Sequence, residues 1–224
     1  MREFASKVSV IVWKDILSQL RSKDVFTSVL VFALLTIIIF NFAFDLDAES
    51  TRIVAPGILW VAFTFAGVLN LNRTFVQEKE NGCLDGLLLC PVDRTVIYIG
   101  KMIGSFLFML VVEIIMLPIF SVLYDFDLFV PKLIVVTILA TLGFAAIGTI
   151  FSAMSANTKA RDIMLPILFF PMVTPIIIAA VEASALALEN APWVDFSTWL
   201  QILIAFDIVF LVVSSLIFEF IMEE

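Results

Sequence analysis

Six long apolar runs, separated by short polar segments, dominate the pattern along the chain. Their approximate limits are Val25–Phe44, Val54–Phe75, Val96–Leu123, Leu133–Met154, Ile163–Val181 and Trp199–Ile221. Each is near the roughly 20 residues that a helix needs to cross about 30 Å of hydrocarbon. The runs lack the strict apolar–polar alternation of strands in a membrane barrel. The pattern therefore predicts an all-α integral membrane protein with six transmembrane helices, in one domain over residues 1–224.

The segment before the first run has a different period. Apolar residues recur there at three- and four-residue steps, at Phe4, Val8, Ile11, Val12, Ile16 and Leu20. This spacing predicts an amphipathic helix over residues 1–24 that lies in the cytoplasmic interface, with Lys14 and Asp15 mostly off the apolar face. A short disordered arm is the alternative, but such an arm has no use for an apolar stripe. The first apolar run begins only at Val25, and no small-residue cleavage site follows it, so we expect no removable signal peptide.

Charge sets the expected orientation. The chain is 62% hydrophobic, and its 21 acidic residues against 13 basic ones leave no basic patch for nucleic acid. Apart from Arg52 and Lys132, the basic residues fall in the N-terminal arm and in the second–third and fourth–fifth connections. The opposite connections carry acids, among them Asp125, Glu182 and Asp195. Because basic residues favour the cytoplasmic side, we expect both termini and the loop at 76–95 to be cytoplasmic.

That loop is the most polar interior segment, "RTFVQEKENGCLDGLLLCP" at 73–91. Leu84, Leu87 and Leu88 stand at i, i+3 and i+4, which predicts a helix of about two turns with one apolar face. A helix this short is marginal alone in water, so we expect it to pack on the bundle or to enter a partner's groove. The residues that we expect to contact such a partner are Glu78, Glu80, Gly82, Leu84, Asp85, Leu87, Leu88 and Pro91.

The chain offers little catalytic chemistry of its own. It has no histidine, and its two cysteines, Cys83 and Cys90, lack the C-x-x-C spacing of a redox or zinc pair. We interpret them as ordinary small residues. No P-loop, G-x-S-x-G or H-E-x-x-H motif occurs. We therefore expect a non-catalytic chain that binds no metal or cofactor, and whose energy comes from an ion gradient or a separate ATPase.

Several motifs resemble a known family of membrane proteins. They are the cytoplasmic "EKENGCLDGLLLCP" followed by "YIGK", then "WKDILSQLRSKD" before the first span, "MLPILFFPMVTPIII" in the fifth and "WLQILIAFDIVF" in the sixth. Together they resemble the permease subunits of ABC exporters. More closely, they resemble the haem exporter permease of the bacterial cytochrome c maturation system. The loop outline is shared with drug and polysaccharide permeases, and the proline-rich fifth span is the more specific part.

The resemblance implies a multi-pass subunit of the bacterial inner membrane that works with a cytoplasmic ABC ATPase. Further implied partners are a haem-handling membrane protein, a small membrane subunit and a second permease copy. ATP would be hydrolysed on the partner, and haem export or release of a haem-loaded chaperone would follow. Two alternatives stay open, namely an ABC-2-type exporter of a drug or glycan, and a membrane scaffold for an ATPase. Because the chain lacks histidine, we expect another subunit to hold any haem iron.

Two acids, Glu113 and Asp207, lie within the apolar runs. Helical rise puts Glu113 roughly 18 Å from Lys101 and Asp207 roughly 12 Å from Trp199, so their depths should coincide. Charges at such depth are costly, which makes both candidates for a polar point on a conduit or a conformational lock between the third and sixth spans. The alternative is a protonated carboxyl bonded to a neighbouring helix or to a partner.

The fifth span contains Pro166, Pro171 and Pro175. Each proline removes one helical hydrogen bond and clashes one turn back, so we expect a kinked or broken helix. The break could serve as a hinge, or the kink could be static and serve packing only. In the fourth span, small residues at four-residue steps predict a face for close helix contact: Thr141, Ala145, Thr149 and Ala153.

Overall fold

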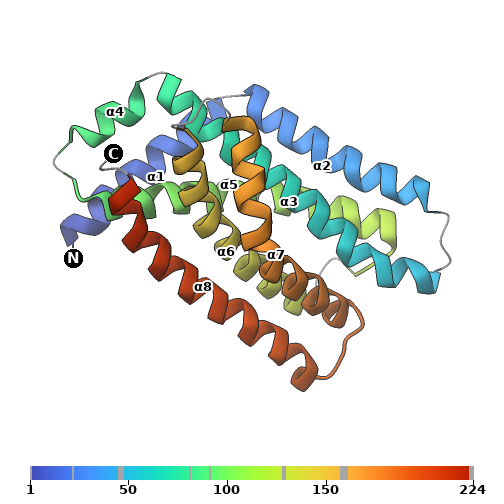
Figure 1. The fold of residues 1–224 in the computed structure, drawn as a ribbon. Helices are drawn as coiled ribbons and strands as arrows, with labels where there is room; N and C mark the ends of the chain where they lie inside the picture. The colour runs from blue at the N-terminus through green and yellow to red at the C-terminus, as the bar shows by residue number, and fades with distance from the viewer. Residues whose placement is uncertain are drawn as a thin grey trace.

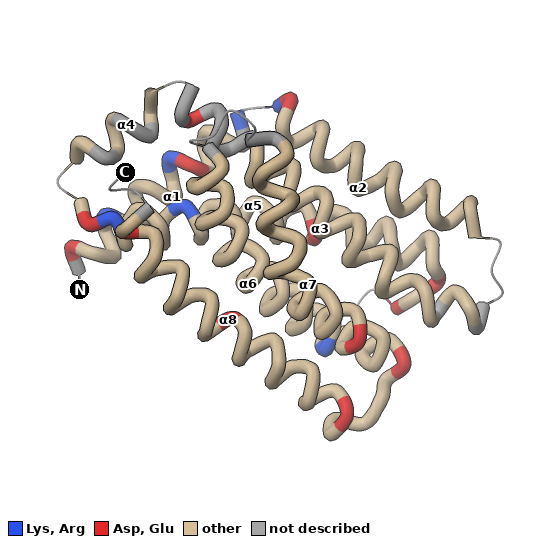
Figure 2. The backbone as a smooth tube through the Cα atoms, viewed as in Figure 1, with Lys and Arg blue, Asp and Glu red and all other residues tan. Residues whose placement is uncertain are grey.

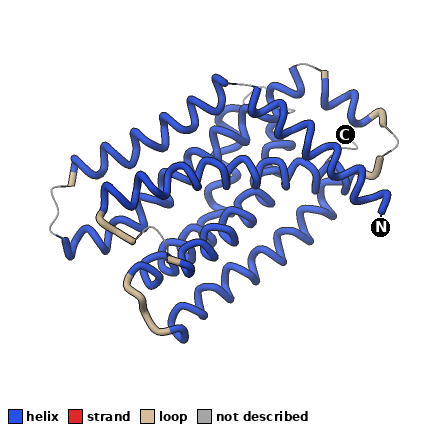
Figure 3. Tube along the Cα trace, turned by 180° about the vertical axis from the view of Figure 1, so that it is seen from behind, coloured by secondary structure: helices blue, strands red, loops and turns tan. Residues whose placement is uncertain are grey.

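The computed structural model describes residues 2–21, 23–44, 48–80, 82–90, 92–127, 130–156 and 161–221. Over these ranges the chain is all-helical, and no strand occurs in them (Figures 1 and 3). The helices in chain order are α1 Arg2–Arg21, α2 Lys23–Ala43, α3 Ala48–Glu80, α4 Cys83–Leu88, α5 Arg94–Tyr124, α6 Pro131–Ala156, α7 Arg161–Leu188 and α8 Trp193–Ile221.

Six of these helices are long and apolar enough to cross a membrane, namely α2, α3, α5, α6, α7 and α8. This confirms the prediction of six spans and of an all-α membrane fold. The helix predicted at the N-terminus is present as α1, while its place in the cytoplasmic interface stays a prediction. Helical structure extends well beyond the hydrocarbon-length stretch in α3, which continues from the apolar segment to Glu80.

The outer ends of α7 and α8 differ from the sequence-based limits. α7 continues seven residues past Val181 to Leu188, and α8 begins at Trp193, six residues before Trp199. Glu182 and Asp195, expected in loops, therefore lie in helices. The alanine-rich end of α7 has high intrinsic helix propensity, and Asp195 in the first turn of α8 interacts favourably with the helix dipole. Hydropathy marks where lipid ends, whereas the helices end where the backbone turns.

The three prolines of the fifth span do not interrupt it. Pro166, Pro171 and Pro175 all lie inside α7, which is continuous from Arg161 to Leu188. Of the two expected forms, kinked or broken, the continuous helix agrees with the kink, because the ribbon of α7 changes direction along its length (Figure 1). Whether the kink acts as a hinge stays a prediction. Packing on α3, α6 and α8 supports the helix where proline removes backbone hydrogen bonds.

Helix α6 is the centre of the bundle and packs against α3, α5, α7 and α8. Its small residues allow this, since the predicted face is buried along its whole length: Thr141, Ala145, Thr149 and Ala153. Close approach is strictest at Gly143 and Gly148, where an added Cβ would clash with the side chains of Asp207 and Leu71, respectively. Small side chains thus let the backbones of neighbouring helices come close together. Such packing matters in a membrane, because the hydrophobic effect does not drive helices together in lipid.

Charged residues gather mostly at the two ends of the bundle, with few acidic positions between them, one of them halfway along α8 (Figure 2). At the end with the α5 start, Arg94 donates a hydrogen bond from Nη1 to the backbone oxygen of Glu219, 3.0 Å away. At the opposite end, Lys132 donates from Nζ to the carbonyl of Ala191 over 2.6 Å and lies above the ring of Trp193. Each contact joins the end of one span to another helix or loop.

Helix α1 packs along α5 with a face that is only partly apolar. Val8 and Ile11, on the predicted apolar face, are buried in the bundle, and the same face continues through Asp15 and Gln19, which are also buried. Phe4, also on the predicted apolar face, is exposed. Asp15 is buried beside an ionic partner on α5, Lys101. The spacing of apolar residues cannot predict such a pairing.

We expect Gly100→Ala to loosen α1. An added Cβ at Gly100 would lie 2.7 Å from Cγ2 and 2.8 Å from Cβ of Ile11, and a Cβ cannot rotate away. Overpacking of this kind costs about 1–3 kcal/mol. The thermal unfolding midpoint in detergent and protease resistance of α1 should both fall.

Gly57→Ala is the matched control. It also adds one methyl group inside a transmembrane helix, but nothing lies within 4 Å of the new Cβ. An equal loss of stability in both variants would contradict close α1–α5 packing at Gly100.

Candidate functional site

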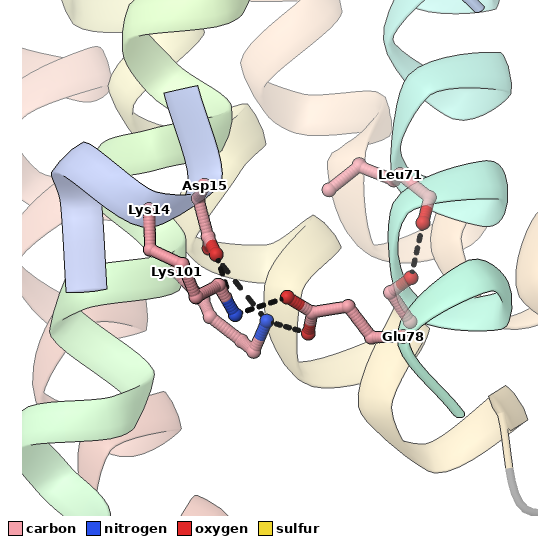
Figure 4. A network of polar contacts seen from close by, with 6 residues as sticks. Lys14, Asp15, Leu71, Glu78 and Lys101 are labelled. Atoms are coloured by element: carbon pink, nitrogen blue, oxygen red, sulfur yellow. Dashed lines mark hydrogen bonds and ion pairs between the residues drawn. The ribbon is translucent and has the colours of Figure 1, made fainter. Parts of the chain in front are cut away.

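Four ionisable side chains from three helices meet at one end of the bundle (Figure 4). Lys14 and Asp15 come from α1, Glu78 from the end of α3 and Lys101 from the first turns of α5. Nζ of Lys14 lies 2.5 Å from Oε1 of Glu78 and 3.0 Å from Oδ1 of Asp15. Nζ of Lys101 donates to Oε2 of Glu78 and lies 3.6 Å from Oδ2 of Asp15. We call these four residues the ion cluster.

The cluster is buried because α1 approaches α5 closely. Side-chain exposure is 1% for Lys101 and 2% for Asp15. Gly100 and Gly104 stand one turn apart on α5, in "GKMIG", and an added Cβ at Gly104 would lie 3.1 Å from Cβ of Asp15. This G-x-x-x-G surface seats α1 and so brings the carboxylate of Asp15 to the ammonium of Lys101.

The cluster is neutral as a whole, with two positive and two negative groups. Burial is the largest influence on Asp15 and raises the pKa of its carboxyl above the ordinary value, although Lys101 opposes it. Burial acts in the same direction on Glu78, but Lys101 and Lys14 together outweigh it, and the pKa of Glu78 lies below its ordinary value. Burial lowers the pKa of Lys14, and the nearby charges of Asp15 and Glu78 outweigh that effect and raise it. Glu78 is therefore the firmly ionised centre of the cluster.

Helix α4, predicted from the leucine spacing, forms directly after this point. Gly82 adopts a left-handed backbone (φ 65°), which reverses the chain between α3 and α4. Leu87 is half-buried against the apolar cluster that includes Val8 and Val96. Leu89, just past α4, is 87% exposed. Of the expected docking residues, Pro91 and the side chains of Glu80, Leu84, Asp85 and Leu88 lie outside what the structure describes.

The structure places Glu78 differently from the other expected docking residues. Its carboxylate is held by two lysines and faces the bundle, so it joins the end of α3 to α1 and α5. Gly82 is exposed, and Leu87 is half-buried against the bundle. The expected docking segment thus consists of a buried anchor at Glu78 and a short helix that is only partly covered.

The two intramembrane acids both face α6. Oγ1 of Thr141 donates to Oε1 of Glu113 over 2.6 Å. Asp207 lies against Gly143, where an added Cβ would clash with Oδ1. Thr141 and Gly143 are two residues apart, so the depths of the two acids agree with the prediction from helical rise. Helix α6 therefore lies between the two acids, and the Thr141 bond matches the alternative of a carboxyl bonded to a neighbouring helix. The link between the third and sixth spans stays a prediction.

Sequence reasoning missed most of the ion cluster. Apolar periodicity and loop motifs place Lys14, Asp15 and Lys101 on polar surface or in a connection, and they predict no long-range pairing. The available signal was the "GKMIG" spacing on α5, which predicts a close helix neighbour. Among the described residues, no group of three or more His, Cys, Asp and Glu side chains could hold a metal ion.

Comparison with known proteins shows one family. The family model described as "CcmB protein" matches residues 6–222. The chain is 25% identical over 177 residues to the Heme exporter protein B of Pseudomonas aeruginosa, covering 79% of each chain. It is 24% identical over 208 residues to that of Bradyrhizobium diazoefficiens, covering 92% of this chain and 93% of the relative. The protein of the same name from Rhodobacter capsulatus is 27% identical over 184 residues, which is 79% of this chain and 84% of the relative.

We expect Lys101→Met to destabilise the fold strongly. The substitution leaves Asp15 and Glu78 buried with only the half-exposed Lys14 to compensate them. Removing one partner of a buried pair typically costs about 3–5 kcal/mol. The thermal unfolding midpoint in detergent should fall, and adding Glu78→Gln should recover part of the loss.

Lys7→Met is the control, because Lys7 is exposed on α1 outside the cluster. A double variant no more stable than Lys101→Met alone would contradict direct coupling between Glu78 and Lys101.

Glu78 also predicts a dependence of stability on pH. Its pKa in the folded chain is lowered from the ordinary 4.5, so its stabilising contribution is complete above that value. The contribution is lost as pH falls through the lowered value. The difference in unfolding midpoint between the wild-type chain and Glu78→Gln should therefore be constant near neutral pH and shrink in acid. A difference that grows on acidification would contradict this assignment.

Proposed function

The chain belongs to the CcmB protein family, and we therefore propose that it is the transmembrane permease subunit of an ABC-type complex for cytochrome c maturation. A separate cytoplasmic ATPase would supply the energy. Movement of this subunit would drive haem export or release of a haem-loaded chaperone at the outer face. Relatives named Heme exporter protein B support haem as the cargo.

The ion cluster supports the part of this proposal that concerns coupling between the ATPase and the transmembrane helices. Glu78 lies before α4 and Lys101 after it, and their contact closes the base of the loop that presents α4. A force applied to α4 by a bound ATPase therefore acts on the ends of α3 and α5 together. Asp15 extends the same connection to α1. A buried ionic junction transmits displacement better than independent loops, since its partners cannot separate without a large desolvation cost.

The proposed topology follows from charge. The end of the bundle that holds Lys14, Arg94 and Lys101 would face the cytoplasm, with both termini on that side. The end with Asp125, Glu189 and Asp195 would face outward. The protein would then be a multi-pass inner-membrane subunit with α1 at the cytoplasmic interface, where Trp13 is exposed at headgroup level.

We assign ATP hydrolysis and haem-iron binding to the proposed partner subunits. ATP would be bound and hydrolysed by the ATPase subunit. Haem iron would be held by a haem-handling membrane protein, because this chain has no histidine to serve as an axial ligand. A small membrane subunit and a second permease copy would complete the assembly, and this chain would itself bind no resident cofactor.

We expect the double variant Leu84→Asp, Leu87→Asp to lose the ATPase. Charged residues at these positions destroy the apolar face predicted for α4. The ATPase subunit that co-purifies with the tagged wild-type chain should be absent, and cytochrome c maturation in cells should fail. Membrane insertion should be unchanged.

Val194→Asp is the matched control, because Val194 is an exposed apolar residue at the opposite end of the bundle. Retention of the ATPase by the α4 double variant would refute α4 as its main docking site. Maturation that needs the ATPase but moves no haem across vesicles would leave a scaffold function instead.

A further inference from the structure

A groove of about 350 Å³ lies between α5 and α6 on the outer surface of the bundle, at the depth of Glu113. Its walls are apolar and are formed by Leu110, Ile114, Leu117, Pro118, Ile134 and Ile138. Ile114, Ile134 and Ile138 are partly exposed in transmembrane helices, so the groove opens toward hydrocarbon. A molecule dissolved in the bilayer could enter it from the side.

Two polar side chains form its floor. Glu113 is 1% exposed, and its Oε1 is already bonded to Thr141, whereas its Oε2 has no hydrogen-bond partner among the described residues. Oγ1 of Thr137, one turn before Thr141 on α6, is likewise buried without a partner there. Leaving such groups unpaired in an apolar setting is unfavourable, because they lose the hydrogen bonds that water would supply. The groove therefore presents unused hydrogen-bonding capacity to whatever enters it.

Pro118 leaves a further backbone hydrogen-bond acceptor unused beside the groove. It lies inside α5 and has no N–H, so the carbonyl of Ile114 one turn earlier receives no helical bond from it. Pro118 and Ile114 both line the groove. Apolar walls with a few converging polar groups are the usual composition of a small-molecule site, and the volume lies at the small end of the range for such sites.

We propose that this groove binds the carboxylic-acid edge of a porphyrin, which rests on the proposed function in haem export. The propionic acid O–H would donate to Oε2 of Glu113, or the two carboxyls would pair if both are neutral. Thr137 would take the second oxygen of the ligand acid, and the macrocycle edge would lie on the isoleucine and leucine side chains. No covalent bond forms or breaks.

The lining residues also exclude one mode of binding. None of the described residues around the groove is a His, Cys, Met or Tyr, so the groove offers no side chain of the kinds that hold haem iron. Recognition should therefore depend on the propionic acids and not on the metal. A lipid acyl chain would fill the walls but would leave Oε2 of Glu113 unpaired, because it has no donor.

The test uses the full chain in phosphatidylcholine nanodiscs, titrated with metal-free protoporphyrin IX and with its dimethyl ester, against empty discs. The free acid should bind more tightly than the ester, which lacks the acidic protons. Glu113→Leu should weaken binding of the free acid about tenfold or more, as expected for loss of a hydrogen bond to a carboxylate. Glu113→Gln, which keeps an acceptor, should lose less.

Glu182→Gln is the control, since Glu182 is an exposed acid on α7 that does not line this groove. It should bind the free acid like the wild-type chain. The acid-versus-ester comparison uses only wild-type protein, so it stays decisive even where Glu113→Leu fails to fold. Haem and metal-free porphyrin should bind with similar affinity.

Three results would overturn the inference. They are equal binding of acid and ester, unchanged binding by folded Glu113→Leu, and binding only of the iron form. Absence of porphyrin binding, with Glu113 protected instead by another membrane subunit, would assign the groove to a partner helix and also reject the proposal. Each leaves the ATPase-coupled function untouched, because that function is tested separately through α4.

Discussion

The contact between Glu78 and Lys101 is the constraint on which the end of the bundle that carries α4 depends. It joins the end of α3 to the first turns of α5 on either side of the α4 loop, and Lys14 and Asp15 add α1 to the same junction. Because three of the four charged side chains are largely buried, none can leave without stranding another in a poorly solvated site. The cluster therefore makes the segment around α4 mechanically continuous with the bundle.

A second constraint lies at mid-depth, where α6 separates two acids. Glu113 meets Thr141 on one side of α6, and Asp207 meets Gly143 on another. Small residues let α5, α7 and α8 approach this central helix, and that closeness leaves little freedom for the carboxyls. In the proposed function, motion that begins at α4 would reach these acids along α5, which carries both Lys101 and Glu113.

Particular residues show why the candidate site was only partly predictable. The leucine spacing predicted a short helix, and α4 is present because such spacing reflects local backbone rules. Glu78 was expected to face a partner, since its neighbours are polar, but two lysines from distant segments hold it instead. Asp15 was assigned to the polar side of α1 for the same reason. Ion pairing across 64 and 86 residues of chain leaves no periodic trace in either helix.

Patterns in the amino-acid order were enough to predict the six spans, the two extra helices α1 and α4, and the shared depth of Glu113 and Asp207. These features follow from apolar length, helical rise and local turn chemistry, which act over a few residues. Three-dimensional packing was needed to show that α7 stays continuous through three prolines, that α6 is central, and that Asp15, Glu78 and Lys101 converge. Those outcomes depend on how closely glycine-bearing surfaces let helices approach, and that distance decides which buried charges can meet.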